Sequence, residues 1–141
     1  MNRSKLSDFG LLLLRMFLCA ILVYYGSQKM LGLFGGEGWN ATLASFQEHF
    51  NFPQWLTMLA IISEFAGSIA VLFGLLTRLA AFGIACTMAT AAYSTFAPTH
   101  DYRSAHLPLA LCGMALALIF TGAGQFSLDG LLAKGKPKPK V

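Results

Sequence analysis

Two charged residues, Arg15 and Glu64, each interrupt a long apolar stretch of this sequence. A charge near the centre of a membrane-spanning helix costs about 2.5–3.5 kcal/mol even on the mildest insertion scale, so such a residue usually has a partner or a function. An arginine and a carboxylate satisfy each other through paired, charge-assisted hydrogen bonds. We therefore predict that Arg15 and Glu64 meet inside a helical bundle. The pair would be either a structural staple or a catalytic pair in which Arg15 tunes Glu64 for proton transfer.

A third charged residue, Lys29, follows Arg15 on the same predicted helix. Offsets of seven, eleven and fourteen residues place Leu22, Gly26 and Lys29 on the helical face that carries Arg15. We expect this face to look into the bundle. Lys29 stands near the outer end of its helix, so its ammonium could also extend to the membrane surface.

Two histidines, His100 and His106, stand six residues apart with Asp101 and Arg103 between them. Histidines at this spacing could ligate haem or copper, but a solvated outer loop explains them without a cofactor, and we favour the loop. The three cysteines lie inside apolar segments and show no CxxC or metal-ligand spacing. The sequence therefore predicts neither a metal site nor a disulfide framework.

The elements that must position these residues are membrane-spanning helices. Of the 141 residues, 56% are hydrophobic and only 11% are charged, whereas soluble domains average about 25% charged residues. One crossing takes about 20 apolar residues, and suitable stretches lie at about 9–31, 55–76, 79–97 and 107–122. We predict an all-α, four-transmembrane-helix bundle over residues 1–133, followed by a disordered basic tail over 134–141.

Lysine and arginine predict how the bundle lies in the membrane. Outside the spans they stand before the first span, between the second and third spans, and in the tail, with Arg103 in an outer loop as the exception. Because cytoplasmic segments carry the excess of these residues, both termini are expected on the cytoplasmic side of the cell (inner) membrane, N-in and C-in. The basic tail would be attracted to anionic membrane lipid, so no nucleic acid is needed to explain its charge.

The loop over residues 32–54 contains an amphipathic pattern. Trp39, Leu43, Phe46 and Phe50 recur at offsets that put them on one side of a helix, which predicts a short helix lying on the outer surface. Small residues also recur every four positions in the third and fourth spans. Such faces let helices approach closely, either within the monomer or in a homo-oligomer.

Three patches of sequence carry a further signal. The first, YYGSQKMLG, places Gly26 and Lys29 in a Gly-x-x-Lys pattern. The second, EFAGSIAVLFGLLTRLAA, contains Glu64, Gly74 and the Thr-Arg pair that follows. The third, GAGQFSLDGLL, contains a G-x-G-x-x-S-L-D pattern that ends at Asp129. In this order, and over essentially the whole chain, the patches resemble the DoxX-like family of small four-helix membrane proteins.

The resemblance implies quinone-linked redox chemistry, because the family's founding member is described as the small subunit of a thiosulfate:quinone oxidoreductase. It implies a quinone-associated membrane subunit in which Arg15, Lys29 and Glu64 line the bundle interior, with His100 and His106 near its mouth. The chain has no dinucleotide fingerprint, iron–sulfur cysteine pattern or P-loop, so we expect a redox partner protein. Two alternatives stay open, a non-enzymatic scaffold or assembly factor and a small-molecule or metal-ion carrier.

Overall fold

The computed structural model describes residues 3–135, which are almost entirely helical. The elements are α1 (Arg3–Leu31), the 3-10 turn η1 (Leu33–Gly35), α2 (Gly38–Phe50), α3 (Gln54–Phe73), α4 (Thr77–Thr99), α5 (Tyr102–Thr121) and α6 (Leu128–Lys134). No strand occurs within residues 3–135. Lys134, the first residue of the predicted tail, ends α6, and residues 136–141 lie outside the described part of the chain.

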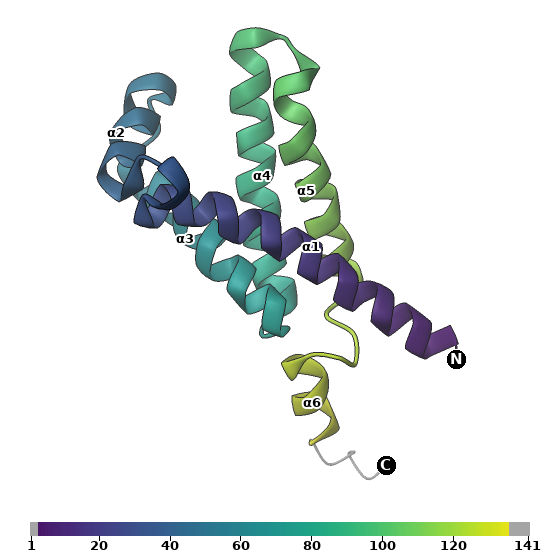
Figure 1. Ribbon diagram of the computed structural model, residues 1–141. Coiled ribbons are helices and arrows are strands. Elements are labelled where there is room, and N and C mark those ends of the chain that lie inside the picture. The colour runs from purple at the N-terminus through teal and green to yellow at the C-terminus, as the bar shows by residue number, and fades with distance from the viewer. Residues whose placement is uncertain (1–2, 136–141) are drawn as a thin grey trace.

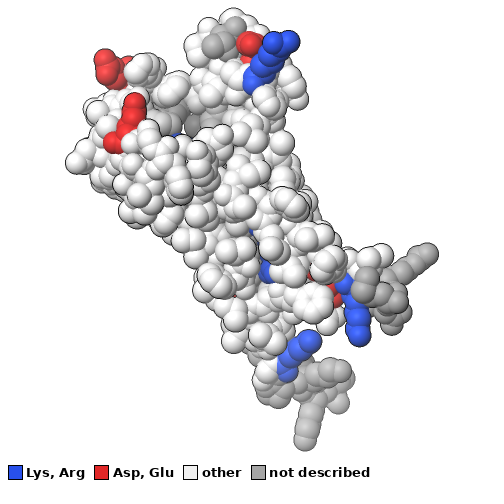
Figure 2. Space-filling model, viewed as in Figure 1, with Lys and Arg blue, Asp and Glu red and all other residues white. Residues whose placement is uncertain are grey.

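Four of these helices are long and apolar enough to cross a membrane. By length and composition the candidate spans are Lys5–Leu31, Gln54–Phe73, Thr77–Pro98 and Tyr102–Thr121. Figure 2 shows charged side chains gathered towards the two ends of the molecule, with an almost wholly uncharged band between them. The predicted all-α bundle with four candidate membrane-spanning helices is confirmed, and so is the helix predicted within the loop over residues 32–54.

The start of the last span was predicted too late in the chain. We expected it near residue 107, but α5 begins at Tyr102, directly after the short turn at His100 and Asp101. The Asp101 side chain accepts a hydrogen bond from the Arg103 N–H at 3.0 Å and so caps the helix. Such a cap satisfies one of the free N–H groups of a first turn. The first turn of α5 contains polar residues, so a search for apolar stretches began the span after this turn.

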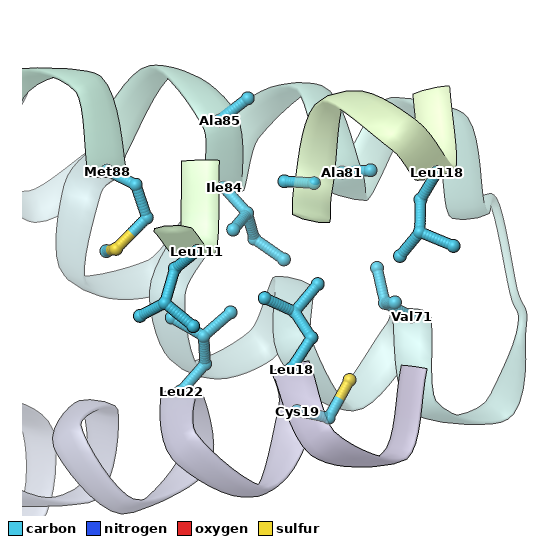
Figure 3. Packing of buried hydrophobic residues seen from close by; sticks show 11 residues of the cluster. Leu18, Cys19, Leu22, Val71, Ala81, Ile84, Ala85, Met88, Leu111 and Leu118 are labelled. Atoms are coloured by element: carbon cyan, nitrogen blue, oxygen red, sulfur yellow. The ribbon is translucent and has the colours of Figure 1, made fainter. Parts of the chain in front are cut away.

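The spanning helices pack as two pairs, α1 beside α3 and α4 beside α5, and a tight turn joins α3 to α4 (Figure 1). Their common core lies where all four helices meet, as Figure 3 shows. The buried core residues are Leu18, Cys19, Leu22, Val71, Ala81, Ile84, Ala85, Met88, Leu111, Ala115 and Leu118. Several are small, which lets the helices approach closely where lipid supplies no hydrophobic drive for association.

After α5 the chain folds back against the bundle, and we call residues 122–129 the closing segment. Arg15 in α1 donates a hydrogen bond from Nη2 to the carbonyl oxygen of Phe126. Gly74, which ends α3 with φ of 69°, lies against the same segment. A Cβ atom on Gly74 would overlap the side chains of Ser127 and Arg15, so only glycine fits there. The closing segment therefore holds α1 and the α3–α4 turn together.

Asp129, at the end of the closing segment, caps a helix that is distant in sequence. Its two carboxylate oxygens accept hydrogen bonds from the N–H groups of Leu76 and Thr77, each at 3.0 Å, at the start of α4. Its own N–H donates to the carbonyl oxygen of Gly74 at 2.8 Å. Burial raises the pKa of Asp129, but the hydrogen bonds from Thr77 and Leu76 and the positive charge of Arg15 outweigh burial and lower that pKa below its ordinary value.

Replacing Asp129 by alanine should lower the free energy of unfolding by about 1–2 kcal/mol at pH 7, because α4 loses its cap. The folded-state pKa of Asp129 is lowered, so its contribution is complete above the pKa of the unfolded chain. That contribution is lost as the pH falls through the lower, folded-state pKa. Thermal unfolding in mild detergent at pH 7 and pH 3 would measure this loss. The difference in unfolding temperature between wild type and D129A should be smaller at pH 3 than at pH 7.

The control is Glu48→Ala, which removes a carboxylate from the exposed surface of α2. This variant should unfold close to the wild-type temperature at pH 7. An equal loss in D129A and E48A would contradict the capping role of Asp129.

Candidate functional site

The charged centre of the bundle is an ion pair between Lys29 and Glu64. The Lys29 Nζ lies 2.6 Å from Glu64 Oε2, the short distance expected of a charge-assisted hydrogen bond. Glu64 is only 2% exposed, whereas the Lys29 side chain is 29% exposed. The carboxylate is therefore held inside the protein, and the ammonium connects it with the surroundings.

Gly26 in α1 explains why these two side chains meet. A Cβ atom at Gly26 would lie 3.1 Å from the Cα of Phe65, so the backbones of α1 and α3 run almost in contact there. Lys29 follows Gly26 by about one helical turn, and Glu64 immediately precedes Phe65. Close approach at the glycine brings the ammonium to the carboxylate. The Gly-x-x-Lys pattern thus has a physical meaning that the sequence alone did not reveal.

The predicted pairing of Arg15 with Glu64 is wrong. Both residues are buried, at 1% and 2% exposure, but Arg15 donates to Phe126 while Glu64 pairs with Lys29. Fourteen residues of helix separate Arg15 from Lys29 by about 21 Å along the axis, so one carboxylate cannot serve both. Helical spacing correctly put Arg15 in the interior and Lys29 on the same side of α1, facing α3, but it carries no information about depth along the partner helix.

A cavity of about 330 Å³ opens beside the ion pair, between α3 and α4. We call it the α3–α4 pocket. Its lining residues are Lys29, Phe46, Phe52, Leu56, Thr57, Leu59, Ala60, Ile61, Ser63, Glu64, Phe82, Gly83, Cys86, Thr87, Thr90 and Ala91. Thr57, Ile61 and Glu64 are buried and form its inner wall. Leu59 and Phe82 are exposed on the apolar surface, so the pocket opens towards the lipid.

Hydroxyl groups where α3 meets α4 add polar character to this pocket. The Oγ atom of Ser63 lies 3.2 Å from the Oγ1 atom of Thr87, and Thr87 also donates to the Gly83 carbonyl oxygen at 2.9 Å. A Cβ atom on Gly83 would lie too close to the Oγ atom of Ser63. Because glycine has no such atom, the two helices can meet at this level. Sequence analysis missed these residues, because serine and threonine inside an apolar span give no distinct signal.

A second cavity, of about 220 Å³, lies on the α2 side of the ion pair. Its lining residues are Gln28, Lys29, Gly36, Glu37, Thr42, Ser45 and Phe46. Lys29 and Phe46 also line the α3–α4 pocket. The Lys29 side chain therefore borders both the α3–α4 pocket, which opens to lipid, and the second cavity beside α2.

The structure does not bring His100 and His106 into the α3–α4 pocket. His100 ends α4 in a left-handed conformation with φ of 49°, and the His106 Nδ1 contacts the Arg103 carbonyl oxygen at the start of α5. Within residues 3–135, no group of three or more histidine, cysteine, aspartate or glutamate side chains could hold a metal ion. A cofactor role for these histidines stays a prediction.

Fold and site together define a small four-helix membrane protein with a buried glutamate, paired to a partly exposed lysine, beside a lipid-facing pocket. Residues 10–97 match the DoxX family model, and the chain belongs to the DoxX family. "Inner membrane protein YqjF" of Escherichia coli is 33% identical over 134 residues, which cover 93% of this chain and 98% of that protein. An "Uncharacterized protein" of Haemophilus influenzae is 32% identical over 143 residues, with 93% and 88% covered. No solved structure matches the chain.

The ion pair predicts unequal effects for its two single substitutions. Lys29→Met leaves the Glu64 carboxylate buried without a counter-charge, and should lower the free energy of unfolding by about 3–5 kcal/mol. Glu64→Gln should cost less, because the partly exposed Lys29 ammonium can turn towards water. The double variant K29M/E64Q should regain most of the loss. Thermal unfolding of all four proteins in detergent gives the coupling energy, and additive losses would contradict the pair.

Proposed function

We propose that this DoxX-family membrane protein binds a quinone in the α3–α4 pocket and serves as the quinone-associated membrane subunit of an oxidoreductase or redox-stress system. One observation carries the proposal. The Lys29–Glu64 pair stands at the inner wall of a pocket whose remaining walls are largely apolar and whose mouth faces lipid. Quinones are lipid-soluble rings with hydrogen-bond-accepting oxygens, which suits an apolar pocket with a few convergent polar groups.

The two charged groups have complementary roles in this proposal. The Lys29 ammonium can donate a hydrogen bond to a quinone oxygen, and the Glu64 carboxyl can deliver or accept a proton. Reduction of a quinone to a quinol takes two electrons and two protons. The electrons come from a redox partner protein, and this chain supplies the binding site and a proton-transfer group. Arg15, which contacts the closing segment, acts in this scheme by holding the helices in place.

Filling the α3–α4 pocket should weaken quinone binding without touching the ion pair. Ala60 lines the pocket on α3, and Ala60→Phe would place a ring in the cavity. Ala66→Phe, on the exposed surface of the same helix, is the matched control. We expect the affinity for a decyl-substituted para-benzoquinone to fall at least about tenfold in A60F and to stay unchanged in A66F. Quenching of tryptophan fluorescence in detergent would measure the affinity.

Wild-type protein that binds no quinone would contradict the proposal. It would favour the non-enzymatic scaffold or assembly factor, in which the Lys29–Glu64 pair only fixes the register of α1 and α3. Equal binding by A60F and wild type would place any bound quinone outside the α3–α4 pocket.

We also propose that the protein lies in the cell (inner) membrane with both termini in the cytoplasm. The start of α1, the α3–α4 turn and α6 lie at one end of the bundle, opposite α2 (Figure 1). Lys5, Arg78 and Lys134 all belong to that end, and the positive-inside rule directs it to the cytoplasm.

Cysteine labelling tests this orientation. In a background without the three native cysteines, Glu48→Cys on α2 should react with a membrane-impermeant maleimide in intact cells whose outer membrane is permeabilised. Arg78→Cys should react only after the inner membrane is broken. The reverse pattern would overturn the proposed orientation.

A further inference from the structure

Thr57 is a buried polar group with an unexplained position. It is 2% exposed, it lines the α3–α4 pocket, and its hydroxyl oxygen has no hydrogen-bond partner among the described residues. Buried hydroxyl groups are nearly always paired, so an unpaired one beside a cavity needs an explanation. The hydroxyl of Thr90, which lines the same pocket, is instead bonded to the Cys86 carbonyl oxygen at 2.9 Å.

Thr57 and Glu64 belong to the same buried face of α3. They are seven residues apart, which is two helical turns, or about 10.5 Å along the axis. Ile61, also buried, lies between them. The inner wall of the pocket thus has a polar side chain at each end, Thr57 and Glu64, and the apolar side chain of Ile61 between them.

We propose that the Thr57 hydroxyl is the second polar anchor of the pocket, and that the ligand is a ring with oxygens on opposite edges, a para-quinone or its quinol. One oxygen meets the Lys29–Glu64 pair. The other accepts a hydrogen bond from Thr57 once rotation about χ1 turns its enclosed hydroxyl towards the pocket, while the ring packs against Ile61. This assignment rests on the proposed function and specifies its substrate class. A ligand with one oxygen would satisfy the ion pair and leave Thr57 unpaired.

The hydroxyl group can be removed with little change in shape by Thr57→Val. The affinity for decyl-para-benzoquinone should fall about 5- to 20-fold, the effect of one lost hydrogen bond to a buried ligand. Thr121→Val removes a hydroxyl that lies outside the pocket and is bonded within its own helix, so the quinone affinity of this control should stay within about twofold of wild type. Thr57→Ser keeps the hydroxyl and should bind as wild type does.

Two further measurements separate a ligand anchor from a structural role. Without quinone, T57V should unfold at or above the wild-type temperature, because no internal hydrogen bond is lost. Para-decylphenol, with one oxygen, should compete more weakly than the quinone in wild type, and the difference between the two affinities should narrow in T57V.

Unchanged quinone affinity in T57V, or a marked loss of its thermal stability without ligand, would overturn the assignment of Thr57. Failure of the wild-type protein to bind quinone would instead refute the proposed function itself. The two failures are therefore distinguished by the wild-type titration.

Discussion

Two almost fully buried charges, Arg15 and Glu64, determine how the helices of this protein fit together. Neither can stand alone in apolar surroundings, and each is matched by a different kind of partner. Arg15 donates to the backbone of the closing segment, which brings the end of the chain against α1. Glu64 pairs with Lys29, which fixes α1 against α3. One contact lies near the middle of α1 and the other near its C-terminal end, and together they set its position in the bundle.

Glycine makes both contacts possible. Gly26 lets α1 approach α3 beside the ion pair, and Gly74 leaves room for Arg15 and Ser127 where the closing segment packs. The patches that resemble the DoxX family contain both of these glycines. In the structure the first patch meets the second at Lys29 and Glu64, and the third meets the second at Asp129 and the start of α4. The resemblance is thus carried by residues that contact one another across the bundle.

The sequence alone predicted those features that depend on amino-acid composition and on the spacing of apolar residues. Apolar stretches of membrane length gave the four spans, and helical spacing gave α2. Spacing also placed Lys29 on the side of α1 that faces α3, but it paired Glu64 with Arg15, because a period gives the face of one helix and not its register against another. The unpaired state of Thr57 could not be foreseen at all, since it depends on which carbonyl groups lie within reach in space.

The two ends of the bundle differ in how completely their polar groups are used. At the α6 end, Arg15 retains Nε and Nη1 atoms without a hydrogen-bond partner among the described residues, yet it lines neither cavity, and Gly74 packs directly against it. That incomplete pairing reflects close packing. At the α2 end, Thr57, whose hydroxyl is unpaired, lines the α3–α4 pocket two helical turns from Glu64. Unpaired polar groups beside open volume are expected mainly where function requires them, which favours the α2 end for the proposed ligand.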